Sequence, residues 1–101
     1  MGIELTKSAK RSIAKLYKSY LDRLRSGENK AQAVFFNNEK SDQAELIRSI
    51  QEDVPELKKV GFVKMDITGC LTIQGEAVVY MENIAGNTLK EWLSFGAQFI
   101  P

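Results

Sequence analysis

The spacing of the hydrophobic residues changes after residue 61, and this change constrains the fold more than any other feature of the sequence. Before that point, apolar residues recur at the three-and-four spacing of helices. From residue 63 to 67 they alternate with polar ones, which is typical of a strand. The dipeptide "TG" then predicts a turn, and "CLTI" a returning strand. The residues expected on the inner face of this hairpin are Val63, Met65, Ile67, Leu71 and Ile73.

A long amphipathic helix is predicted over residues 6–26. Its apolar residues lie on one side, Thr6 can cap its start and Gly27 can end it. The next segment allows two interpretations. Asn29 and Gln32 have the spacing of a capping box, which favours a short helix through Phe36. The valine and phenylalanines of "AVFF" favour a strand instead. We expect the helix over 30–36, with the strand as the alternative.

Two further helices are predicted before the hairpin, over residues 42–51 and 54–60. Residues with capping-box spacing mark the start of each helix, namely Asp42 with Glu45 and Asp53 with Glu56. Pro55 suits a first helical turn, and Gly61 can end the second helix with Phe62 folded back on Leu57.

The segment after the hairpin predicts two more helices. Thr72 is expected to cap the helix that begins within "IQGEAVVYMEN", and Gly86 with Asn87 interrupts it. The stretch "LKEWLSFGAQFIP" then predicts an aromatic helix over 88–100 that packs on the domain, on a second copy in a homodimer or on another protein. Its expected interface residues are Leu89, Trp92, Leu93, Phe95, Phe99 and Ile100.

Composition places these elements in one domain and limits its chemistry. A chain of 101 residues with 44% hydrophobic content predicts a single domain, with a core over 1–87 and the aromatic helix over 88–101. No apolar run reaches the roughly 20 residues that span a bilayer, so we expect no membrane association, and the single cysteine favours a reducing cytoplasm.

The sequence contains no histidine and one cysteine, Cys70. These residues supply neither a thiolate–imidazole nucleophile nor the usual tetrahedral zinc site. We therefore expect no enzymatic activity, no metal, no cofactor and no small-molecule ligand. Tyr17, Tyr20 and Tyr80 fall on apolar helix faces, which favours core positions over base stacking.

The order of three helices, a hairpin and a further helix resembles a winged helix-turn-helix domain. The stretch "ELKKVGFV" looks like a third helix that enters the first strand of the wing, and "LTIQGEAVVYMEN" looks like the phrase that leads from the second strand into the following helix. The chain also resembles small winged-helix proteins of bacterial and prophage gene sets, on "YMEN" and the ending "FIP". The resemblance implies a mainly helical α+β fold with a wing at about 62–73, and a DNA-binding, transcriptional regulatory function.

The distribution of charge along the sequence leaves two functional hypotheses. The net charge is only +1, so nucleic-acid binding requires a local patch. Residues 41–60 contain more acids (Asp42, Glu45, Glu52, Asp53, Glu56) than bases (Arg48, Lys58, Lys59). The first hypothesis is binding of double-stranded DNA through the cations of the first helix and those near Gly61. The second is a protein-interaction module that uses the 88–100 helix. The residues expected to contact DNA are Lys7, Lys10, Arg11, Lys18, Arg25, Lys58, Lys59 and Lys64.

Overall fold

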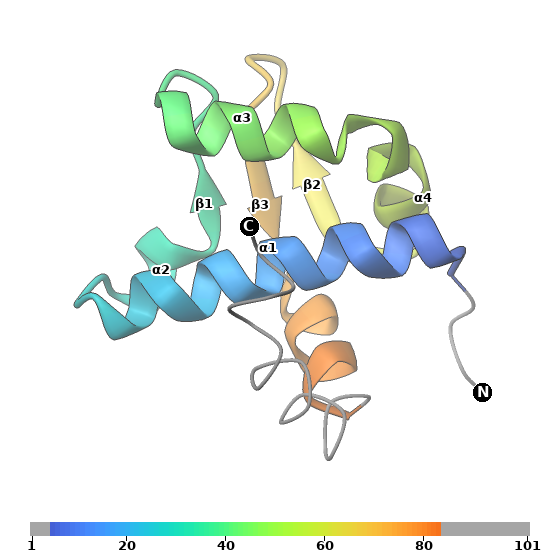
Figure 1. Cartoon of the computed structure of the whole chain (residues 1–101), viewed down its shortest axis with the longest axis horizontal. Coiled ribbons are helices and arrows are strands. Elements are labelled where there is room, and N and C mark those ends of the chain that lie inside the picture. The colour runs from blue at the N-terminus through green and yellow to red at the C-terminus, as the bar shows by residue number, and fades with distance from the viewer. Residues whose placement is uncertain (1–4, 84–101) are drawn as a thin grey trace.

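Helices form most of the structure, which a computed structural model describes for residues 5–83 (Figure 1). In chain order the elements are α1 (Lys7–Arg25), α2 (Lys30–Ala33), β1 (Phe35–Phe36), α3 (Ser41–Ser49), the 3-10 turn η1 (Gln51–Asp53), α4 (Val54–Lys59), β2 (Val63–Met65) and β3 (Leu71–Ile73). A further helix covers residues 75–83. The predicted α+β class is confirmed. The predicted helix over 88–100 lies outside the described residues.

The first helix begins and ends where its caps predict. Thr6 has extended backbone angles, and its hydroxyl oxygen accepts a hydrogen bond from the Ala9 N–H at 3.2 Å. At the other end Gly27 has a φ of 107°, a conformation that glycine adopts without the steric penalty of a Cβ. These local signals fix both ends of α1.

Three antiparallel strands form the sheet, in the order β1-β3-β2. The β2–β3 hairpin is confirmed, but a third strand, β1, pairs with β3 through Phe35 opposite Thr72 and Phe36 opposite Leu71. The expected helix through Phe36 is therefore wrong at its end: α2 stops at Ala33 and the alternative strand follows. The edge of β3 that β2 leaves free lets Phe35 and Phe36 pair their backbone groups with β3. The paired residues are more than 30 positions apart in the sequence.

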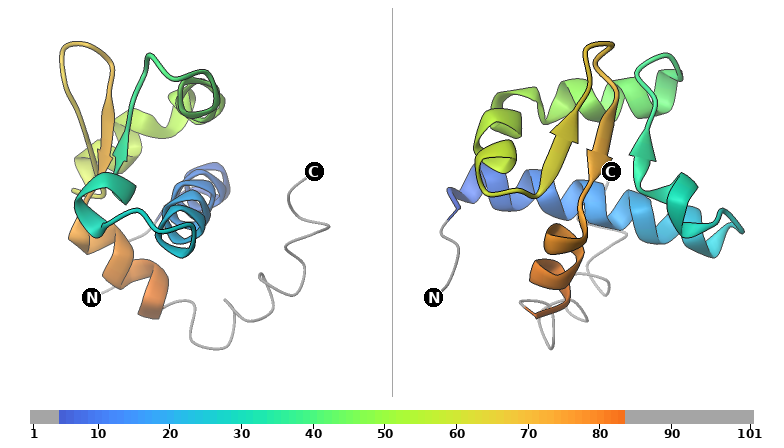
Figure 2. Two further views of the ribbon diagram at one scale, coloured as in Figure 1. Left: turned by 90° about the vertical axis from the view of Figure 1, so that its left-hand side faces the viewer. Right: turned by 180° about the vertical axis from the view of Figure 1, so that it is seen from behind.

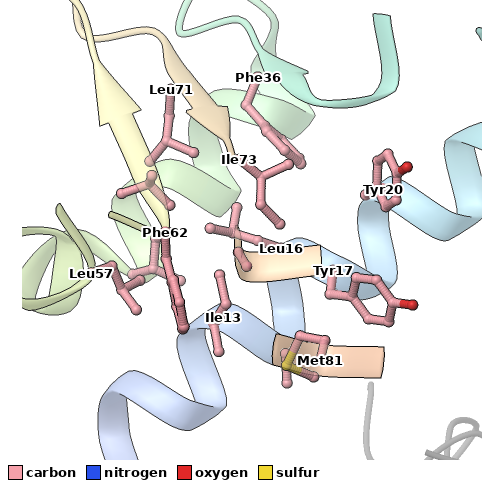
Figure 3. Packing of buried hydrophobic residues seen from close by; sticks show 14 of the residues in the cluster. Ile13, Leu16, Tyr17, Tyr20, Phe36, Leu57, Phe62, Leu71, Ile73 and Met81 are labelled. Carbon is pink, nitrogen blue, oxygen red and sulfur yellow. The ribbon is translucent and has the colours of Figure 1, made fainter. Parts of the chain in front are cut away.

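One face of the sheet is covered by α1 and α3, as the edge-on view shows (Figure 2). Buried side chains from the sheet, Phe36, Leu71 and Ile73, meet Ile13 and Leu16 of α1 (Figure 3). Leu57, Phe62 and Met81 complete the same cluster. All the large side chains in its centre are fully buried, so the core lies between the sheet and α1.

Two of the expected capping boxes do not form. α3 begins at Ser41 after Lys40, and Asp42 lies in its first turn without capping it. η1 leads directly into α4, so Asp53 already has near-helical backbone angles (φ −96°, ψ −8°) instead of the extended ones of a capping residue. Pro55 does lie in the first turn of α4, as predicted.

The end of α4 follows the prediction, whereas the hairpin departs from it at two residues. Gly61 has a φ of 80°, and the Phe62 N–H donates to the Leu57 carbonyl at 2.9 Å, which closes the helix. Ile67 is fully exposed and does not face inward, because β2 ends at Met65 and the turn redirects the chain. Thr72 lies within β3 and does not cap the next helix.

Candidate functional site

The solvent-facing side of α1 is strongly basic. Its apolar residues point into the core, which leaves the cations of the opposite side exposed or half-exposed. Lys15 belongs to this set although the sequence prediction omitted it; its position four residues after Arg11 is the signal that identifies it. We define the basic face of α1 as Lys7, Lys10, Arg11, Lys15, Lys18 and Arg25.

Few carboxylates offset this positive charge. The α1 segment contains one acid, Asp22, whose Oδ2 lies 3.8 Å from Lys18 Nζ. Within residues 5–83 the other members of the basic face form no ion pair. A surface with this many free cations attracts polyanions.

Two acids of the α4 region hold the N-terminal end of the basic face in place. The Thr6 N–H and hydroxyl donate to the two carboxylate oxygens of Glu56, at 2.8 and 2.9 Å. Ser8 and Ser12 donate through their hydroxyls to Asp53 Oδ2. Because the orphan N–H groups of a helix N-terminus favour negative charge, this arrangement caps α1 from another part of the chain.

These contacts change the meaning of the acidic 41–60 segment. Asp53 and Glu56 are half-buried acceptors for α1 and are not an outward-facing acidic surface. Two of the five acids of this segment therefore stabilise the contact between α4 and α1. Lys59 follows Glu56 in α4 and is exposed.

A groove lies between α3, α4 and the hairpin. Its volume is about 650 Å³, and its floor is formed mainly by apolar groups of Ile47, Val54, Pro55 and Met65. Four polar side chains also line it, and none is a carboxylate: Asn38, Arg48, Gln51 and Lys58. Lys58 thus faces a different surface from Lys59, although the two are neighbours in sequence.

The tip of the hairpin has a closely hydrogen-bonded turn. The Oδ1 atom of Asp66 accepts from the Thr68 hydroxyl at 2.6 Å and from the N–H groups of Thr68 and Cys70 at 2.9 and 3.0 Å. The pKa of Asp66 is lower than its ordinary value, mainly because the Thr68 hydroxyl donates to the carboxylate. The backbone N–H groups of Cys70, Thr68 and Gly69 lower it further. Asn38 Nδ2 donates to the Thr68 carbonyl at 3.2 Å, which ties the tip to the 37–40 loop.

Lys64 lies apart from the other predicted DNA contacts. It is exposed on β2 in a cross-strand row with Thr72 and Phe35, whereas the flanking Val63 is buried. This row is on the sheet face opposite α1. The eight predicted residues therefore do not share one surface: five lie on the basic face of α1, Lys58 lines the groove, Lys64 is on the outer sheet face, and Lys59 is exposed on α4 outside the groove.

The tyrosines and Cys70 occupy structural positions. Tyr17 and Tyr20 are buried and turn their hydroxyls away from the core cluster (Figure 3). Burial raises the pKa of Tyr17, and Glu82 and Tyr20 raise it further, so this phenol stays neutral. The Tyr80 ring lies 4.8 Å from the ring of Phe62. Cys70 is buried, and its sulfur accepts from the Asn38 N–H at 3.5 Å.

Sequence reasoning missed one polar residue, Arg23, which links α1 to α2 and β1. Its guanidinium forms a bidentate pair with Glu28, which lowers the pKa of Glu28, and lies 5.2 Å from the centre of the Phe36 ring. It also donates to backbone carbonyls at the junction of α2 and β1, those of Gln32, Ala33 and Phe35. The chain order offers no signal for this role, because the carbonyls become neighbours only after α2 ends.

Two further kinds of feature are missing from the part of the chain that the structure describes. Among residues 5–83 no helix has the length and apolar character to cross a bilayer, and no three Cys, Asp or Glu side chains are grouped to hold a metal ion. Comparisons of the chain with known protein families, curated proteins and solved structures found no match. The predicted interface residues of the 88–100 segment lie outside the described residues.

Proposed function

We propose that this chain is a non-enzymatic winged-helix module that binds double-stranded DNA mainly through the phosphate backbone. Three main helices, α1, α3 and α4, precede the β2–β3 hairpin, and another helix follows it. This order is the one on which the resemblance to winged helix-turn-helix domains rests. The hairpin takes the place of the wing, and β1 adds a third strand to it.

The basic face of α1 is the observation that carries the proposal. The α1 segment contains seven Lys or Arg residues and one Asp, a net charge of +6. The whole chain has a net charge of +1, so the remaining residues sum to −5. Positive charge is thus concentrated on one helix, which is the electrostatic footprint of a phosphate-binding surface.

The same face predicts little discrimination between DNA sequences. Lysine and arginine along an exposed helix reach phosphates, whereas base reading requires side chains that enter a groove. α4, which would be the groove-entering helix of a winged-helix domain, is only six residues long. We therefore expect binding that depends strongly on salt and weakly on sequence.

The proposal is tested by fluorescence anisotropy of a labelled random duplex, titrated at several salt concentrations. The variant Arg11→Ala/Lys15→Ala removes two exposed cations from the basic face, and alanine preserves the helix because it has the highest helix propensity. If both side chains contact phosphates, the slope of log affinity against log salt should become shallower by about 2.

The matched control is Lys30→Ala/Lys40→Ala, which removes the same charge from exposed residues outside α1. This control should keep the wild-type slope. Equal losses of duplex affinity in the two variants would show that only the net charge of the protein matters, and would contradict a specific role of α1. No saturable binding by the wild type at low salt would contradict the proposal.

A further inference from the structure

The groove between α3, α4 and the hairpin is a second surface, and its chemistry differs from that of the basic face. Phosphates require cations, and the basic face of α1 offers them with little apolar surface. The groove instead combines a mainly apolar floor with one cation on each helical wall, Arg48 on α3 and Lys58 on α4. Its volume of about 650 Å³ is comparable with that of small-molecule pockets, although the groove is open to solvent.

The charges that line the groove have one sign. Arg48 and Lys58 are both exposed, and neither forms an ion pair within residues 5–83. The acids Glu45 and Glu52 are nearby in sequence but do not line the groove. An occupant that carries carboxylates beside an apolar group would complement this surface.

We propose that the groove binds a short acidic segment of a partner protein, with an apolar side chain on the floor and carboxylates directed to Arg48 and Lys58. Asn38 and Gln51 supply amide groups that can bind the backbone of the segment. This inference concerns a different surface from the proposed DNA contact and does not depend on it.

An acidic peptide fits the groove better than a DNA duplex does. A duplex presents hydrated phosphates, which gain nothing from the apolar groups of Ile47, Val54 and Met65. The adjoining hairpin tip presents a fully exposed apolar side chain, Ile67. An exposed apolar side chain favours protein contact over contact with hydrated phosphate.

The test is selection from a phage-displayed library of random peptides, about twelve residues long, against the full chain. The selected peptides are then labelled and measured by fluorescence polarisation. The expected result is enrichment of sequences that combine Leu, Phe or Trp with Asp or Glu. The variant Arg48→Glu/Lys58→Glu should lower the affinity of such a peptide at least tenfold, because both substituted side chains are exposed and now repel it.

The matched control is Lys10→Glu/Arg11→Glu, which makes the same charge change on the basic face. It should leave peptide affinity within twofold of the wild type while it weakens duplex binding. No enrichment, enrichment of sequences without acids, or equal loss in both variants would overturn the peptide site. Loss of duplex binding in Arg48→Glu/Lys58→Glu, without peptide binding by the wild type, would assign the groove to DNA instead.

Discussion

At the scale of single residues, Arg23 shows how one side chain can join segments that have no local reason to meet. Its side chain is only 15% exposed, and it satisfies the backbone carbonyls at the end of α2 and along β1. The end of a helix leaves carbonyls without partners, and a guanidinium can bind several of them at once. Arg23 therefore lets a four-residue helix end beside a strand.

Replacement of Arg23 by methionine should destabilise the protein by about 2–4 kcal/mol. Methionine keeps much of the apolar volume but removes the Arg23 hydrogen bonds to the Ala33 and Phe35 carbonyls and the pair with Glu28. Urea unfolding would measure the change as a lower midpoint. Arg25→Met is the control, because Arg25 is exposed on the same helix, and it should stay within about 0.5 kcal/mol of the wild type. Equal effects of the two substitutions would contradict this role of Arg23.

At the scale of elements, the turn of the hairpin depends on Gly69. Its φ is 88°, and a Cβ built there would lie 2.8 Å from Asn38 Nδ2. Gly27 also has a positive φ, of 107°, but a Cβ there would meet no atom within 4 Å. Alanine substitutions at the two glycines therefore distinguish the free-energy cost of backbone strain alone from the cost of strain together with a steric clash.

Gly69→Ala should destabilise the protein more than Gly27→Ala does. Both changes carry a backbone penalty of about 1–2 kcal/mol, and Gly69→Ala also displaces the Asn38 side chain from the Thr68 carbonyl. The free energies of unfolding of the two variants provide the measurement. A larger loss for Gly27→Ala would show that the contact with Asn38 does not hold the turn.

The Asp66 turn should lose stability in acid. The folded pKa of Asp66 is lower than its unfolded value, so the unfolded chain takes up the proton first as the pH falls. The stabilisation is complete above the unfolded pKa of about 3.9 and disappears as the pH drops through the lower folded value. The difference in unfolding free energy between wild type and Asp66→Ala should therefore be constant near neutral pH and shrink below about pH 4. A difference that does not change with pH would contradict this.

The elements also show which parts of the structure the sequence could predict. α1, the α2 capping box of Asn29 and Gln32, and the glycine at the end of α4 follow from residues only a few positions apart, and all are confirmed. β1 was misassigned because Phe35 and Phe36 pair with β3, far along the chain. The capping box predicts that a helix begins but not where it ends, and pairing with β3 makes Phe35 and Phe36 a strand, the alternative interpretation.

The candidate site was predictable in part for the same reason. The basic face of α1 follows from helical spacing, including Lys15, which the sequence prediction omitted. The roles of Asp53 and Glu56 could not be predicted, because their capping-box spacing is local whereas their hydrogen-bond donors are on α1. The separation of Lys58 from Lys59 and Lys64 depends on how α4 and β2 are placed, which spacing alone does not give.

At the scale of the whole molecule, Phe36 lies where distant segments meet. It is fully buried, pairs with Leu71 in the sheet and is covered by the Arg23 guanidinium. β1 thus connects α1 with the hairpin. A destabilising substitution at this position should therefore affect the whole described domain and not one element alone.

Phe36→Ala should lower the free energy of unfolding by about 3–5 kcal/mol, because it removes a large buried side chain and leaves a cavity. Helix content by far-UV circular dichroism and tertiary packing by near-UV signals should fall together in one denaturant transition. Separate transitions for the two signals would show that the helices fold independently of the sheet.

The uneven distribution of charge has a consequence for how the molecule meets other molecules. A net charge of +1 gives almost no long-range pull, yet within residues 5–83 a charge of +6 on α1 against −4 on the rest gives the described part of the protein an electric dipole. Near a polyanion, within a screening distance of about 8 Å at physiological salt, such a dipole experiences a torque. The molecule would be turned before contact so that α1 leads the encounter and the opposite side trails.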